Sequence, residues 1–251
     1  MENAKLNNRV LLYSVLICGI SFIIGLAIFA NAFYNSRHET KTLEVTGSAK
    51  KVVSSDVVKW GGTISRIVTV NELKTGSAQI RKDEQQVEDF FGKNGIDKKD
   101  LTVSPVFVYD IRKQEYNSGE TKEKGPVQYS LNQYISIQSK DIDKVVAMAK
   151  DAQQLLDSGI MFLPNELQYY YSKLSEARIE LLGAATQDAK QRAEKIASSS
   201  GSKVGNLQSA SVSPVQVLPV NSTEVSDYGA YDTSTRDKEI TVTIKAYFAL
   251  K

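Results

Sequence analysis

The pattern of hydrophobic positions opens with one long uninterrupted run. Val10–Ala30 contains 21 residues and no charge. As a helix it would span about 32 Å, enough for a hydrocarbon core of about 30 Å. We therefore predict a cytoplasmic tail at residues 1–9 and a transmembrane signal anchor at residues 10–30. The alternative is a cleaved signal peptide, because Ala30-Asn31-Ala32 matches an A-x-A site and cleavage could follow Ala32. Either alternative exports the remainder of the chain.

Beyond a polar linker at residues 31–41, hydrophobic residues recur every two residues in some segments and about every 3.6 residues in others. The two-residue period predicts strands at 42–53, 56–70, 101–110, 127–138, 160–170, 204–220 and 239–250. The helical period predicts helices at 71–91, 141–156 and 172–199. A charged hairpin loop is expected at 111–126, and Pro105 indicates an edge or a bulge in its strand.

The order of these elements predicts the fold class. One extra strand precedes a βαββαβ-like core, the split βαβ order, and a long helix and two C-terminal strands follow it. We therefore predict an α+β fold, with residues 42–251 as one extracytoplasmic domain.

Composition limits the chemistry that this domain could perform. Apolar residues make up 41% of the chain and the net charge is only +2, so a real core is expected and nucleic acid is not an expected partner. The single cysteine, Cys18, lies in the apolar run, and the single histidine, His38, lies in the linker. Thiol, Ser-His-Asp and zinc chemistry therefore have no candidate residues, and phosphate-binding glycine motifs are absent. We predict no catalytic residue, no metal and no cofactor.

Acidic residues are the remaining chemical groups. Asp83 and Glu84 lie on a lysine-bearing helix and are expected to be solvated surface charges. Asp227, Asp232 and Asp237 recur in a late polar loop, but their spacing is not that of an EF-hand, so a Ca²⁺ site there is a minor alternative.

Two features suggest protein contacts. Small residues repeat along the long helix predicted at 172–199. We expect this small-residue face to pack on the protein's own sheet, and an oligomer contact is the alternative. The possible interface alanines are Ala177, Ala185, Ala189 and Ala193. Tyr228 and Tyr231 lie in the late loop and are interface candidates, because tyrosine combines apolar area with a polar tip.

Four segments in order resemble the SIMPL domain family, the YggE-like envelope proteins. They are Leu43-Glu44-Val45-Thr46-Gly47-Ser48-Ala49, Phe91-Gly92-Lys93-Asn94-Gly95-Ile96, Tyr134-Ile135-Ser136-Ile137, and the helix end Ala189-Lys190-Gln191-Arg192-Ala193-Glu194-Lys195-Ile196-Ala197. The resemblance covers residues 42–250 and implies an α+β fold and an envelope location. It also implies homo-oligomers in some members and an association with oxidative stress tolerance. The family has no agreed catalytic residues, so none is transferred.

The leading hypothesis is a non-enzymatic protein anchored in the inner membrane, which self-associates or binds envelope partners. A binding protein for a small ligand or an envelope polymer is the second hypothesis, and a deep cleft would favour it. An enzyme that uses carboxylates and tyrosines is the third. Paired acids with raised pKa values would favour it.

Overall fold

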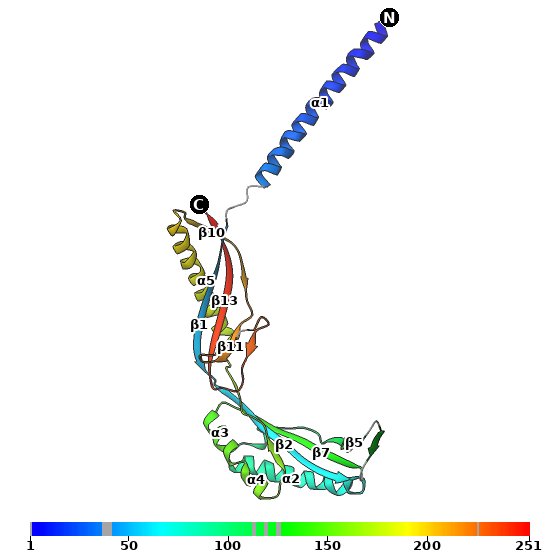
Figure 1. The fold of residues 1–251 in the computed structure, drawn as a ribbon, viewed down its shortest axis with the longest axis vertical. Helices are drawn as coiled ribbons and strands as arrows, with labels where there is room; N and C mark the ends of the chain where they lie inside the picture. The colour runs from blue at the N-terminus through cyan, green and yellow to red at the C-terminus, as the bar shows by residue number, and fades with distance from the viewer. Residues whose placement is uncertain (1, 37–41, 112–113, 118–119, 124–126, 225) are drawn as a thin grey trace. The chain divides into compact units, whose positions relative to one another are not determined.

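The computed structural model describes residues 2–36, 42–111, 114–117, 120–123, 127–224 and 226–251 (Figure 1). Part of the predicted linker, including His38, lies outside the described residues. The chain divides into two compact units: residues 1–47, 187–211 and 245–251 form the first, and residues 48–186 and 212–244 form the second.

The N-terminal helix α1 runs over Glu2–Ser36. Within it, Tyr13–Asn31 is apolar enough to cross a membrane, and none of that stretch is buried in the chain. This segment overlaps the predicted anchor at residues 10–30. A signal sequence near the N-terminus can be equally long and apolar, so this helix agrees with either alternative.

One sheet of six strands follows the predicted split βαβ topology. Its strand order is β3-β7-β2-β8, with β4 also pairing with β7 and β9 with β2. The strands are β2 (Val57–Thr69), β3 (Leu101–Val103), β4 (Phe107–Ile111), β7 (Gln128–Ser139), β8 (Phe162–Pro164) and β9 (Gln168–Tyr170). β2 and β7 are central and antiparallel, and they pair from Val58↔Ser139 to Thr69↔Gln128. This is the order that a βαββαβ unit adopts.

Helices cover one face of this sheet (Figure 1). They are α2 (Leu73–Lys93), α3 (Ile142–Asp151) and α4 (Gln153–Asp157). Short 3-10 turns precede α2 at Val70–Glu72 and β3 at Lys98–Asp100. The core between helices and sheet contains Trp60, Ile64, Phe91, Ile135 and Val145, each at most 2% exposed. The alternation of apolar residues in β2 and β7 therefore places one side of each strand in the core.

A second sheet contains five strands. The strands are β1 (Thr42–Ser54), β10 (Val204–Val212), β11 (Gln216–Pro219), β12 (Ala230–Tyr231) and β13 (Asp237–Leu250). Its order is β1-β13-β11-β12, and β10 also pairs with β13. The long helix α5 spans Leu174–Ser199. A separate hairpin is formed by β5 (Gln114–Asn117) and β6 (Glu120–Glu123), where a charged hairpin loop was predicted.

Several predicted elements are present but divided. The strand expected at 101–110 forms β3 and β4, which are separated around Pro105, where the sequence indicated an edge or bulge. The strand expected at 160–170 forms β8 and β9, and the strand expected at 204–220 forms β10 and β11. The helix expected at 141–156 forms α3 and α4. Pro105 lies between β3 and β4, and Pro214 lies between β10 and β11. Proline interrupts a strand because it donates no backbone hydrogen bond to the neighbouring strand.

Candidate functional site

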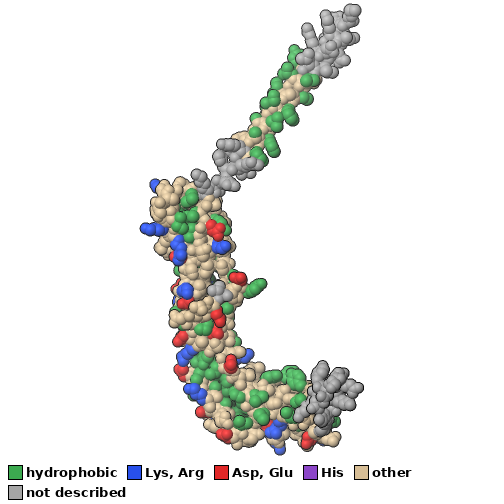
Figure 2. All heavy atoms as spheres, in the orientation of Figure 1, with side chains coloured by type: hydrophobic (Ala, Val, Ile, Leu, Met, Phe, Trp, Pro, Cys, Tyr) green, Lys and Arg blue, Asp and Glu red, His purple; other side chains and the backbone are tan. Residues whose placement is uncertain are grey.

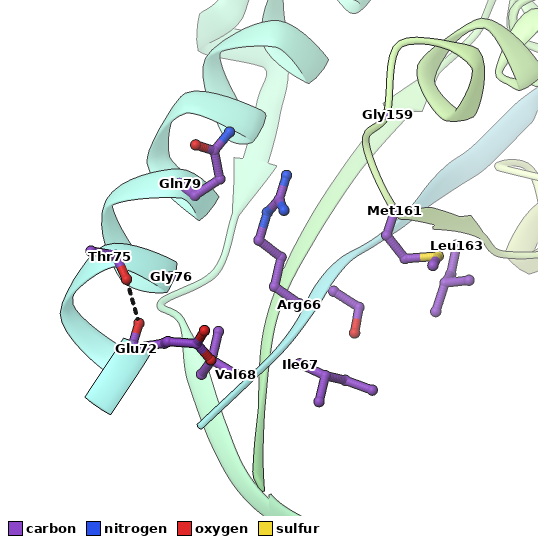
Figure 3. A pocket seen from close by; sticks show the side chains of 11 residues that line it. Arg66, Ile67, Val68, Glu72, Thr75, Gly76, Gln79, Gly159, Met161 and Leu163 are labelled. Carbon is purple, nitrogen blue, oxygen red and sulfur yellow. Dashed lines mark hydrogen bonds between the residues drawn. The ribbon is translucent and has the colours of Figure 1, made fainter. Parts of the chain in front are cut away.

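A cleft of about 750 Å³ lies between the start of α2 and the edge of β2 (Figure 3). Ser65, Arg66, Ile67 and Val68 line it from β2, and Met161 and Leu163 line the other side. β2 pairs with β8 only over Gly62–Ile64, and the backbone N–H of Ser65 donates to Met161 O at 3.0 Å. The segment that precedes β8 therefore separates from β2 where the cleft begins. This leaves a mixed polar and apolar hollow of the size that small ligands occupy.

An ion pair forms one wall of the cleft. Arg66 donates to both carboxylate oxygens of Asp83, through Nε to Oδ2 and through Nη2 to Oδ1 at 3.0 Å. Gln79 Nε2 also donates to Oδ1, at 3.1 Å. The hydrogen bond to Asp83 raises the pKa of Arg66. This fork joins β2 to α2, and the carboxylate balances the charge of Arg66 at the cleft.

Asp83 corrects the sequence prediction. It was expected to be a solvated helix charge, but only 1% of its side chain is exposed. The helical pattern places residue 83 on the same face as Ile80 and Val87, both of which are buried. The signal in the sequence was an acidic residue on an apolar stripe with an arginine on the neighbouring strand. Glu84 lies beside it and accepts a hydrogen bond from Gln133 Nε2 at 3.0 Å.

The other carboxylate at the cleft serves the turn that begins α2. Glu72 accepts hydrogen bonds from the backbone N–H of Thr69 at 2.9 Å and from its hydroxyl at 2.8 Å. These bonds lower the pKa of Glu72. Thr75 in turn donates from its hydroxyl to Glu72 O at 3.0 Å (Figure 3). A general acid at neutral pH requires a raised pKa, so Glu72 is suited to capping the helix and not to giving up a proton in a reaction.

The possible interface residues on α5 are buried within the chain itself. Ala185, Ala189 and Ala193 are 0% exposed and Ala177 is 3% exposed. Side chains covered in this way present no surface to a second copy unless the fold opens. Their burial favours the packing alternative that the sequence analysis preferred.

The two loop tyrosines differ in their surroundings. Tyr228 is 98% exposed, as an interface candidate in a loop should be. Tyr231 is 36% exposed, and its hydroxyl accepts a hydrogen bond from the backbone N–H of Tyr171 at 2.9 Å. Its ring stacks on Tyr170 at a centroid distance of 6.0 Å. Tyr231 therefore already has internal contacts, and an interface role for either tyrosine stays a prediction.

A buried lysine occupies the loop that was considered for Ca²⁺. Lys238 Nζ donates to Asp232 O at 2.5 Å and to Thr235 O at 2.6 Å, and its side chain is 0% exposed. Burial lowers the pKa of Lys238, although Asp232 opposes that effect. Burial acts to raise the pKa of Asp232, but hydrogen bonds from Ser234 and Thr235 together with Lys238 lower it. The ammonium group of Lys238 is thus the cation that these loop oxygen atoms contact. The sequence pattern did not indicate this role.

No group of three or more His, Cys, Asp or Glu side chains suited to a metal ion occurs among the residues that the structure describes. The free thiol of Cys18 is exposed on α1.

Asp56 accepts hydrogen bonds from the backbone N–H of Ser172 at 2.7 Å and from its hydroxyl. Burial acts to raise the pKa of Asp56, but the bonds from Ser172 outweigh it and lower the pKa. Asp56 therefore connects the start of β2 to the residues that precede α5.

Comparison with known families gives one match. The model of a family described as SIMPL, protein of unknown function (DUF541), matches residues 43–248. No curated protein matches the chain.

Proposed function

The chain belongs to the SIMPL family, and from that premise we propose that it is a membrane-anchored, non-enzymatic envelope protein that self-associates. The observation that carries this proposal is the exposure of α1: its Tyr13–Asn31 stretch is apolar and has no part buried in the chain (Figure 2). An apolar surface of this kind requires an apolar environment. Thirteen residues of Val10–Ala30 are Leu, Ile, Val or Phe, and together they favour insertion into a membrane by about 4–8 kcal/mol.

The proposed orientation places residues 1–9 in the cytoplasm and residues 42–251 outside it. Lys5 and Arg9 precede the apolar run and support this orientation. In a bacterial cell this corresponds to the inner membrane. A link with envelope or oxidative stress tolerance, as the family resemblance implies, would then act through binding and not through thiol chemistry, because Cys18 is the only cysteine in the chain.

The non-enzymatic part of the proposal is supported by the carboxylates. Asp56, Glu72 and Asp232 all have lowered pKa values, whereas acid catalysis at neutral pH would be served by raised ones. The only histidine is His38, so an imidazole base is not available in residues 42–251. Self-association is supported by the exposure of Tyr228 and by tethering, which concentrates weakly interacting copies in one plane.

Membrane attachment and orientation can be tested together. We expect the full chain to remain in the membrane pellet after alkaline carbonate washing, with the N-terminal sequence intact. Because Cys18 is the only cysteine, a Cys18→Ser background accepts single reporter cysteines at Asn3 and at Ser199. A membrane-impermeant maleimide added to spheroplasts should label only the Ser199→Cys variant. A mature N-terminus at Phe33, or labelling at Asn3→Cys alone, would contradict the proposal.

Self-association has its own test. The mass of the full chain in mild detergent, corrected for bound detergent and measured by light scattering across a dilution series, should exceed that of one chain. Tyr228→Ala should reduce this mass without changing the melting temperature. A strict monomer at the highest concentration would remove self-association from the proposal and leave membrane attachment intact.

A binding function is the second candidate, and the cleft beside α2 specifically favours it. Its volume of about 750 Å³ and its exposed Met161 and Leu163 suit a small apolar ligand. A ligand there would be detected as a rise in melting temperature that Met161→Lys abolishes. Ile179→Lys is the matched control, because Ile179 is 75% exposed and does not line the cleft.

A further inference from the structure

The register of β2 and β7 gives their sheet a face that the core helices do not occupy. Trp60, Ile64, Ile135 and Ile137 point into the core, so the residues that alternate with them point to the opposite face. These outward residues are Lys59, Gly61, Thr63, Ser65, Ile67 and Thr69 of β2, and Gln128, Ser130, Asn132, Tyr134, Ser136 and Gln138 of β7. We call this surface the outer face.

The outer face is depleted of charge. Lys59 is the only charged residue among its twelve positions on the two central strands, although 24% of the whole chain is charged. The other positions are mainly hydroxyls and side-chain amides. A sheet face that contacted only water would be expected to carry more charge, and depletion of charge is a property of binding surfaces.

Aromatic rings add to this uncharged surface. The pairing Phe107↔Asn132 and Tyr109↔Ser130 places two aromatic residues of β4 on the outer face. Phe107, Tyr109 and Tyr134 are 42%, 49% and 43% exposed. The rings of Phe107 and Tyr134 lie 5.9 Å apart with an interplanar angle of 57°. The result is an exposed aromatic platform surrounded by neutral hydrogen-bonding groups.

A cavity of about 500 Å³ adjoins Tyr134. Polar groups that line it include Lys59, Ser136, Asn165, Glu166 and Gln168. Gly61 is among the residues that line it, and a Cβ at this position would lie 2.0 Å from Ile135 O. The close approach of the two strands therefore requires glycine, and this part of the lining carries no side chain.

We infer that the outer face binds a neutral glycan. Sugar rings present apolar C–H faces that can stack on Tyr134 and Phe107, and their hydroxyl and acetamido groups match the amides and hydroxyls around those rings. Charge complementarity supports this occupant, because an uncharged polymer does not require ion partners. Single-stranded nucleic acid also stacks on aromatic sheet residues, but its phosphates require a cationic groove. Lys59 is accompanied at the cavity by Glu166, so no such groove forms there.

The binding itself goes beyond the proposed function, and only its cellular setting rests on the proposed extracytoplasmic location. The experiment therefore uses the purified full chain in mild detergent, where topology has no influence. The probes are the hexamer of N-acetylglucosamine and cellohexaose, measured by isothermal titration calorimetry. Polygalacturonate, a negatively charged glycan, is the charge control.

We expect at least one neutral hexamer to bind and polygalacturonate to bind more weakly. Tyr134→Ala should weaken binding about tenfold, which corresponds to about 1.4 kcal/mol. Tyr134→Phe retains the ring and should keep most of the affinity, and Tyr109→Ala tests the platform on a second strand. Ile179→Ala is the control, because Ile179 is 75% exposed and belongs to α5 and not to the outer face. Melting curves of each variant confirm folding.

Three results would overturn the inference. The first is that neither hexamer binds at millimolar concentration. The second is that Ile179→Ala weakens binding as much as Tyr134→Ala, or that both platform variants bind like the native chain. The third is that Tyr134→Ala converts an oligomer to a monomer in light scattering, since the outer face would then be an interface between copies. A monomer whose neutral-glycan binding depends on Tyr134 would support the inference and refute self-association separately.

Discussion

Adjacent alanines on α5 allow one substitution to be compared in two environments. Ala185 is fully buried, whereas its neighbour Ala184 is exposed. A glutamate at either position has nearly the same helix propensity, which differs from that of alanine by less than about 0.7 kcal/mol. The difference between Ala185→Glu and Ala184→Glu therefore isolates the effect of burial.

The expected effect at Ala185 has two parts. Extra atoms in a closely packed site cost about 1–3 kcal/mol, and a buried carboxyl group without a hydrogen-bond partner costs about 1–3 kcal/mol even when it is protonated. We therefore expect a loss of about 2–6 kcal/mol, against a typical total stability of about 5–15 kcal/mol. For a chain of this size the melting temperature should fall by roughly 4–24 °C. Ala184→Glu should change it by a degree or two at most.

Urea denaturation of the full chain in mild detergent measures this difference. Circular dichroism reports the helices, α5 included. Trp60, the only tryptophan and 2% exposed, reports by fluorescence the core between α2–α4 and the six-stranded sheet, which contains no residue of α5. Ala189→Glu, at a second buried alanine, should behave like Ala185→Glu. The reasoning is refuted if Ala185→Glu unfolds at the same urea concentration as Ala184→Glu while the oligomer falls apart, because the face would then be an interface.

Three further outcomes are expected from thermal melting of single variants. Gly61→Ala should destabilise by about 1–3 kcal/mol through its clash with the neighbouring strand, while Gly92→Ala, which meets open space, should be neutral or stabilising. Asp83→Ala should cost about 3 kcal/mol, at the low end for a buried pair because the Arg66 side chain is 29% exposed. Asp56 has a lowered pKa, so its stabilisation is complete above its ordinary value of 3.8 and is lost as the pH falls below it. Asp56→Asn should therefore flatten the acid side of the stability profile.

The sequence was most informative where one pattern had one physical explanation. An uncharged run of 21 residues can only be accommodated in an apolar environment, and the structure gives α1 an exposed apolar stretch at Tyr13–Asn31. Strict alternation in β2 and β7 fixed both strands to within a few residues, because a one-residue slip would turn the apolar side outward. The same periodicity predicted the βαββαβ order that the sheet topology confirms.

Local patterns could not specify which polar residues would be buried. Asp83 was expected to be in water because acidic residues on helices usually are, but Arg66 on the neighbouring strand pairs with it in the fold. No pattern in the sequence distinguishes Lys238 from other lysines, and only the path of residues 232–235 gives its ammonium group two backbone carbonyls. Both outcomes depend on partners that are brought close by the fold.

The sequence by itself thus determined the apolar N-terminal helix, the order of strands and helices, and the absence of thiol and imidazole chemistry from residues 42–251. Only the tertiary structure decided that β4 pairs with β7, and therefore that Tyr134 joins Phe107 on an exposed platform. It also decided that the alanines of α5 are covered within the chain. The physical reason is that periodicity specifies the sides of an element, whereas packing between distant segments specifies what each side contacts.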